Sequence, residues 1–130
     1  MRPAFATTWK GSVQPRKQRK YQYNAPYHVK GRFLAVHLSP ALRKQHATRA
    51  ARIRKGDKVK VLRGNHKGKE AKVDRVDPKH TKVYLARIEH SKPDGTKTPI
   101  GFHPSSLMIT ELDLEDKKRK AKLEKKKKKE

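Results

Sequence analysis

The stretch from Val59 to Val73 constrains this chain most, because two short alternating segments flank a glycine-containing turn. Val59, Val61 and Val73 are β-branched and alternate with lysines, a pattern typical of strands with one buried and one solvated face. Gly64 and Gly68 enclose the turn, and glycine readily adopts the positive φ that tight turns require. The stretch therefore predicts a β-hairpin. The polar and cationic groups at its tip are Arg63, Asn65, His66, Lys67 and Lys69.

The charge of the chain indicates which kind of partner the tip of this hairpin could bind. Thirty-six Lys and Arg against twelve Asp and Glu leave a formal charge of +24 on 130 residues. A free domain of this size usually carries a charge of magnitude about 2–8. Such self-repulsion favours a polyanionic partner. Nucleic acid fits better than a membrane, because no segment has enough amphipathic apolar character to lie on a lipid surface.

Composition also excludes several classes of function. There is no cysteine, which excludes disulfides, thiolate metal sites and cysteine nucleophiles. No apolar run approaches the roughly 20 residues of a membrane span, and the first fifteen residues do not resemble a secretory signal. We therefore expect a cytoplasmic protein without a membrane partner.

The N-terminal part is a basic arm. Residues 1–55 hold fourteen Lys and Arg and no acid, and residues 16–20 contain four cations in five positions. Tyr21, Tyr23 and Tyr27 follow, with a turn predicted at Asn24-Ala25-Pro26. Cations interleaved with aromatic rings suit RNA, because cations neutralise phosphates and rings stack on bases. The alternative is a solvated tail whose tyrosines pack on the domain. The arm residues expected to contact RNA are Arg16, Lys17, Arg19, Lys20, Tyr23, Lys30 and Arg32, with Arg52, Arg54 and Lys55 extending the contact beside the first strand.

Three segments are expected. Residues 1–53 form the basic extension, unstructured over 1–15, with a short helix near 39–47 capped by Ser39 and a basic connector over 48–55. Residues 54–112 form the compact domain. Residues 113–130 form a basic tail whose helix begins near Asp113, because acids at the start and cations at the end complement the helix dipole. The lysine run 125–129 is expected to fray.

The compact domain is predicted to be mainly β. Alternating apolar residues and turn sequences indicate five short strands, at about 58–63, 69–76, 81–87, 98–101 and 107–112. Five short strands with tight turns favour a small barrel. The expected core consists of Val59, Val61, Val73, Val76, Val83, Leu85, Ile100, Leu107 and Ile109.

No catalytic or metal site is predicted. The glycine turn is not a nucleotide-binding loop, because three residues instead of four separate its glycines and Glu70 stands where Ser or Thr should bind magnesium. The seven histidines form no pair at helical spacing. The carboxylate pair considered for hydrolysis is Asp74 and Asp77, which sits among lysines. His66 and His103 are better suited to polar RNA contacts, and no cofactor is expected.

The hairpin resembles the KOW motif of ribosomal proteins and transcription elongation factors, with Gly64, Lys67 and Gly68 matching its centre. The family usually has glycine where this chain has Ala71. Further segments recur in the order of one family: residues 14–20, Tyr23-Asn24-Ala25-Pro26, residues 38–43, residues 53–57 and His103-Pro104-Ser105. Together they resemble the large-subunit ribosomal proteins numbered twenty-four in bacteria and twenty-six in eukaryotes, in the archaeal and eukaryotic branch.

That resemblance implies an SH3-like barrel and a structural role in the large ribosomal subunit. It implies binding to large-subunit rRNA near its 5′ region, a position near the polypeptide exit tunnel and a role in subunit assembly. Neighbouring large-subunit proteins are implied partners, and nascent-chain factors at the tunnel exit are a further expectation. The alternative is a KOW-containing transcription elongation or antitermination factor, which would need a polymerase-binding domain for which 130 residues leave no room.

Overall fold

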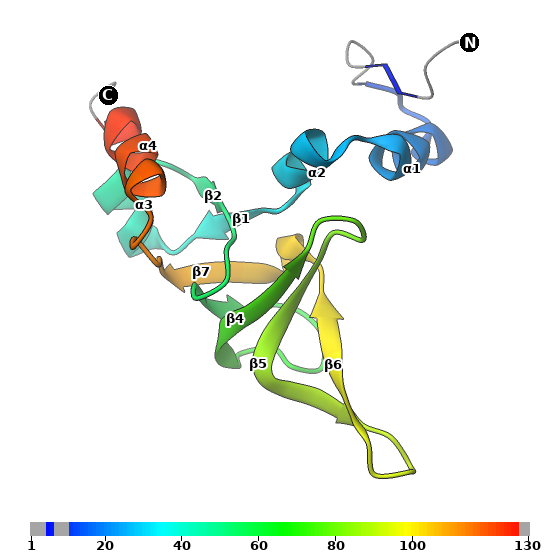
Figure 1. The fold of residues 1–130 in the computed structure, drawn as a ribbon. Helices are drawn as coiled ribbons and strands as arrows, with labels where there is room; N and C mark the ends of the chain where they lie inside the picture. The colour runs from blue at the N-terminus through cyan, green and yellow to red at the C-terminus, as the bar shows by residue number, and fades with distance from the viewer. Residues whose placement is uncertain (1–4, 7–10, 128–130) are drawn as a thin grey trace.

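The computed structural model describes residues 5–6 and 11–127, and its centre is a twisted seven-stranded sheet (Figure 1). The strands are β1 (Ala35–Leu38), β2 (Ala50–Arg52), β3 (Lys58–Val61), β4 (Glu70–Asp77), β5 (Lys82–Ser91), β6 (Lys97–Phe102) and β7 (Leu107–Glu111). Their order is β2-β1-β7-β3-β4-β5-β6. The one parallel pair among the described strands is β1 with β7. The helices are α1 (Pro15–Asn24), α2 (Tyr27–Phe33), α3 (Pro40–His46) and α4 (Lys117–Lys127), with a short 3-10 turn, η1 (Pro104–Ser106).

The mainly β prediction is confirmed, and all five predicted strands are present as β3 to β7. The predicted barrel is not closed, because β6 ends the sheet and does not pair with β7. Register shifts in the β3–β7, β4–β5 and β5–β6 pairs mark the places where the ladder is interrupted. Arg87, at a φ of 63°, lies inside the last of these irregularities. Such irregularities bend strands, which curves the sheet without joining its edges.

Two strands were not predicted, and both precede residue 54. β1 pairs with β2 and with β7, so this part of the chain belongs to the same sheet as the KOW hairpin. The alternation Leu34, Val36, Leu38 is a strand pattern, and all three side chains are buried. β2 lies within the segment that was predicted to be only a connector. Its sequence, Ala-Ala-Arg, has no strand preference, so only its pairing with β1 makes it a strand.

The hydrophobic core extends across the sheet. Seven of the nine predicted core residues belong to the buried cluster, and Val76 and Ile100 are partly buried against it. The residues that the prediction missed are Leu34, Val36, Leu38, Ile53, Ile88 and Phe102. Four of these six come from the segment before residue 54. The core is therefore larger than the hairpin domain alone could build.

The helices differ from the predictions mainly at the N-terminus. The short helix near 39–47 is confirmed as α3, with Ser39 at its N-cap accepting a bond from the Leu42 N–H. The basic arm, by contrast, forms two helices that Ala25 and Pro26 separate. A residue before proline is disfavoured in helical geometry, which explains why α1 ends there. Residues 11–14 form no helix or strand, and the rest of the predicted unstructured lead-in lies partly outside the described residues.

The C-terminal helix begins later than predicted, at Lys117 instead of near Asp113. The Asp113 N–H is held by Asp57, and Asp113 in turn accepts a bond from the Glu115 N–H. Asp116 accepts the Lys118 N–H at 2.9 Å, as an N-cap does. The acids therefore shape the turn into the helix. Of the lysine run expected to fray, residues 125–127 lie in α4, and 128–129 lie outside the described residues.

A buried ion pair fastens α4 to the sheet. The Asp57 side chain is 0% exposed, and both of its oxygens accept from the Arg119 guanidinium, at 2.6 and 2.7 Å. Asp57 also accepts from the Arg54 N–H at 2.8 Å. The remaining Arg119 hydrogen bonds reach the carbonyls of Asp113 and Arg52, at 2.7 and 3.1 Å. A bidentate pair with all these bonds made is the arrangement in which a buried charge is compensated.

Candidate nucleic-acid interface

The KOW turn, residues 62–69, is a rigid projection between β3 and β4. The Val61 N–H donates to the Lys69 carbonyl at 2.9 Å, and the Gly68 N–H donates to the Val61 carbonyl at 2.8 Å. Within the turn, the Lys67 N–H donates to the Gly64 carbonyl and the Lys69 N–H to the His66 carbonyl. With its backbone groups bonded internally, the turn presents Arg63, Asn65, Lys67 and Lys69 to solvent.

The two turn glycines are required by backbone conformation. Gly64 and Gly68 have φ values of 89° and 87°, in the region that side-chain-bearing residues rarely adopt. A Cβ at either position would meet nothing within 4 Å. The two glycines are therefore explained by the backbone conformation of the turn and not by a lack of space for a side chain. Ala71, where the family usually has glycine, pairs with Val59 and packs against the core cluster.

The loop at 102–106 lies against this turn. The Leu62 N–H donates to the Ser106 carbonyl at 2.8 Å, and the His66 ring meets the Phe102 ring edge-on at 5.9 Å. His103 caps η1, because its Nδ1 accepts the Ser105 N–H at 3.2 Å. The structure thus brings His103 together with the turn. We call the turn surface the set Arg63, Gly64, Asn65, His66, Lys67, Gly68, Lys69 and His103.

Arginines from other elements adjoin the turn surface. The pKa of His37 on β1 is lowered by burial and then by the positive charges of Arg43, Arg49 and Arg63. The charges of three arginines therefore act on one histidine of β1. Arg43 and Arg49 were not among the predicted site residues, and their positions depend on α3 and the β1–β2 pairing. Arg43 Nε also donates to the Leu38 carbonyl at 2.8 Å, which fixes its orientation.

The second group of cations lies on α1 and α2, across the molecule from α3 and α4 (Figure 1). Arg16, Lys17, Arg19 and Lys20 are all exposed on α1, which has no buried residue. Lys30 of α2 places its ammonium 6.0 Å from the centre of the Tyr23 ring. We call the arm surface the set Arg16, Lys17, Arg19, Lys20, Tyr23, Lys30 and Arg32.

The three arm tyrosines have different surroundings. Tyr21 packs between Phe5 and Phe33, with ring centres 4.8 and 6.2 Å away. Tyr23 and Tyr27 are 81% and 67% exposed. Tyr21 therefore anchors α1 by packing within the protein, which is the role that the alternative of a solvated tail gave to all three tyrosines. Tyr23 and Tyr27, by contrast, are available to a partner. Tyr27 was absent from the predicted site, because the sequence does not separate packed from exposed rings.

The three cations beside β3 have different roles. The Arg52 guanidinium lies 2.6 Å from the place where a Cβ on Gly31 would stand, so this glycine admits the arginine against α2. Arg54 pairs with Asp116, and its hydrogen bond is the main cause that lowers the pKa of Asp116. Lys55 is exposed. Arg52 and Arg54 therefore hold helices in place as well as adding positive charge.

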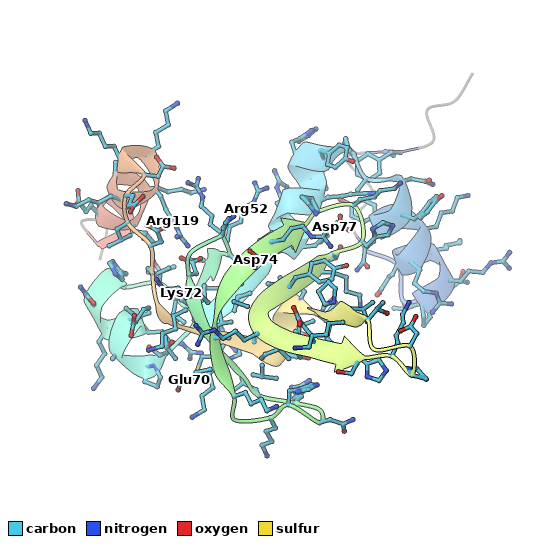
Figure 2. All side chains as sticks on the ribbon, turned by 60° about the horizontal axis from the view of Figure 1, so that its bottom comes forward. Arg52, Glu70, Lys72, Asp74, Asp77 and Arg119 are labelled. Carbon is cyan, nitrogen blue, oxygen red and sulfur yellow. The ribbon has the colours of Figure 1, made fainter. Side chains whose placement is uncertain are left out.

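The described residues show no group of three His, Cys, Asp or Glu side chains that could hold a metal ion. Asp77 serves the β4–β5 turn, because it accepts from the Lys79 N–H at 2.9 Å and pairs with His80 at 2.7 Å. That His80 hydrogen bond is the main cause of the lowered pKa of Asp77. Asp74 is exposed and lies three residues earlier on the same strand, β4 (Figure 2). Over the described part of the chain, no helix is long and apolar enough to cross a membrane.

Comparison with known proteins identifies this arrangement. The family model described as ribosomal proteins L26 (eukaryotic) and L24 (archaeal) matches residues 12–126. The chain belongs to this ribosomal protein family. The match covers both helices of the arm, the whole sheet and α4 up to its last described residue but one. The resemblance seen in the sequence, including the archaeal and eukaryotic branch, is therefore confirmed.

Archaeal relatives agree with this family assignment. The large ribosomal subunit protein uL24 of Methanothrix thermoacetophila is 48% identical over 108 residues, which cover 83% of this chain and 93% of the relative. The uL24 proteins of Methanoculleus marisnigri and Methanosarcina barkeri are 49% and 45% identical. The matches cover 93% and 98% of these two relatives, and 86% and 88% of this chain, respectively. The transcription-factor alternative has no support among these matches.

Proposed function

We propose that this ribosomal protein is a structural constituent of the large subunit that binds large-subunit rRNA through two separate cationic surfaces. The carrying observation is the separation of the two surfaces in a single folded unit, because the turn adjoins the start of β4 at Glu70, whereas α1 and α2 lie toward the other end of this strand, near Asp77 (Figure 2). Each surface is fixed by its own contacts. The Tyr21 ring packs α1 against Phe5 and Phe33, and backbone hydrogen bonds hold the turn. The protein would work in the cytoplasm as part of the ribosome, and we expect no enzymatic activity.

The mechanism is electrostatic and geometric. Lys and Arg on both surfaces neutralise phosphates and release condensed counterions, which supplies affinity without reading sequence. Because the two surfaces lie toward opposite ends of β4, RNA segments distant in sequence can be held in one relative position. Such bridging supports the role in subunit assembly that the family resemblance implies.

The salt dependence of binding tests this mechanism. With rRNA extracted from the large subunits of the source organism, we expect log affinity to fall linearly with log salt. The slope should be about −0.7 to −0.9 for each phosphate neutralised, and several should contribute. Filter binding between low and moderate potassium concentrations measures it. A slope near zero would contradict the proposal.

We also propose a position near the polypeptide exit tunnel, beside other large-subunit proteins and open to nascent-chain factors. The support is the resemblance of the whole chain to its family.

The chain has no cysteine, so a single introduced cysteine can carry a photo-cross-linker. Asn65→Cys and Gln18→Cys would place one on each surface of intact large subunits. Adducts to rRNA from both are expected, and an arm adduct found only on protein would overturn its RNA role.

Tyr23 and Tyr27 are expected to stack on unpaired bases. Replacing either with Leu keeps apolar area but removes the aromatic face. Affinity for a single-stranded ten-nucleotide uridine RNA should fall about tenfold per ring, and Tyr23→Phe should retain binding. Fluorescence anisotropy with this RNA, and with a base-free ribose-phosphate strand of equal length, measures the effect. Equal losses on both strands would show that the rings do not act by stacking.

A further inference from the structure

A cationic cleft lies between β2 and α4, and none of its lining residues belongs to the arm surface or the turn surface. It encloses about 270 Å³ and is lined by Ala50, Ala51, Arg52, Arg54, Lys118, Arg119, Lys122 and Leu123. Five of these eight residues are cationic and none is acidic. Arg52 and Arg119, labelled in Figure 2, belong to the two elements that form its walls.

Some of the cationic side chains that line the cleft are held by contacts within the protein, and others have no ion-pair partner among the described residues. Arg119 is held by Asp57 and by the Arg52 carbonyl, and Leu123 is buried one turn further along α4. Arg54 is held by Asp116. No ion-pair partner is found for Lys118 or Lys122 within the described chain. Two cations are therefore presented to one side by a helix whose orientation the buried pair fixes.

The acids near this region lie elsewhere. Asp113, Glu115 and Asp116 line a neighbouring hollow with Arg54, Lys55 and Arg119. The described acids next to Arg54 and Arg119 thus face the other hollow or are already paired. An anion entering the β2–α4 cleft would meet positive charge on its walls and small apolar side chains on its floor.

We propose that the β2–α4 cleft is a third RNA contact, which takes a phosphate and its ribose from the large-subunit rRNA backbone. Lys118 and Lys122 bind the phosphate, and Ala50 and Ala51 leave room for the sugar beside it. The inference rests on the proposed function, since it assigns α4 to the same ligand. The sequence predicted a basic helix in this tail but could not show that the Arg119–Asp57 pair orients it.

Paired charge removal on the two sides of α4 tests the proposal. Lys118→Gln with Lys122→Gln removes two charges from the cleft. Lys117→Gln with Lys120→Gln removes two charges from residues of the same helix that do not line it. Glutamine keeps helix preference similar, and Arg119 and Leu123 are untouched in both variants. Binding of the full chain to extracted large-subunit rRNA is measured across a series of salt concentrations, with circular dichroism to check folding.

If the cleft holds phosphate, its variant loses about 0.7–0.9 from the salt slope for each phosphate released, and the outer variant keeps the wild-type slope. At about 0.1 M salt, the loss of one such contact is expected to weaken binding fivefold to tenfold. Equal changes in both variants would show diffuse attraction to the helix and would overturn the proposal. No change in either would overturn it as well, whereas a wild-type slope near zero would instead reject the proposed function.

Discussion

Asp57→Asn is expected to destabilise the fold by about 3–5 kcal/mol, the cost of breaking a buried ion pair on one side. The carboxylate accepts two bonds from Arg119 and one each from the Arg54 and Asp113 N–H groups. Asparagine removes the charge, leaves Arg119 buried at 7% exposure without compensation, and places an N–H₂ group against existing donors. Small domains are stable by only about 5–15 kcal/mol. The substitution should therefore remove a large fraction of the total stability, and the variant should unfold at a much lower urea concentration than the wild type.

Urea unfolding followed by circular dichroism measures this loss. Lys58→Gln is the matched control, because it breaks the exposed pair of Lys58 with Glu111 and should cost little stability. Arg119→Met should cost much less in the Asp57→Asn background than alone, since the two residues act as one unit. A cost for Asp57→Asn as small as that of the control would show that α4 is not fastened through this pair.

The hairpin is the part of the fold that sequence predicts best. Its strands alternate at period two, and its glycines mark a turn that proves to need positive φ. These are local properties, which a few consecutive residues carry by themselves. His103 was also predicted as a contact residue, but its place beside the turn depends on the bond from the Leu62 N–H in the turn to the Ser106 carbonyl in η1.

What sequence could not supply depends on contacts between distant segments. β2 is a strand only because β1 lies beside it, and Asp57 meets Arg119 across 62 residues. The two helices of the arm were missed for another reason. Residues 15–24 consist mostly of good helix formers, so their composition favours a helix. They have no apolar stripe, however, so hydrophobic periodicity gives no sign of that helix. Tyr21 then supplies the tertiary contact that orients α1.

The largest effect on RNA binding is expected from the arm surface. Replacing Arg16, Lys17, Arg19 and Lys20 with Gln removes four charges from a helix with no buried residue, so α1 should keep its structure. If each cation neutralises one phosphate, the salt slope becomes less steep by about 3. Because one log unit separates 0.1 M from 1 M salt, affinity at 0.1 M should fall about 10³-fold, and the difference should vanish toward 1 M.

A matched loss of four charges separates contact from net charge. Lys72, Lys79, Lys92 and Lys97 are exposed on the sheet and its loops and belong to neither surface, so their replacement with Gln leaves the same formal charge. Filter binding to extracted large-subunit rRNA should show a change of slope below about 1 for this control. If both quadruple variants lose the same slope, the protein binds RNA as a diffuse polycation, and the helical arm has no special part in holding it.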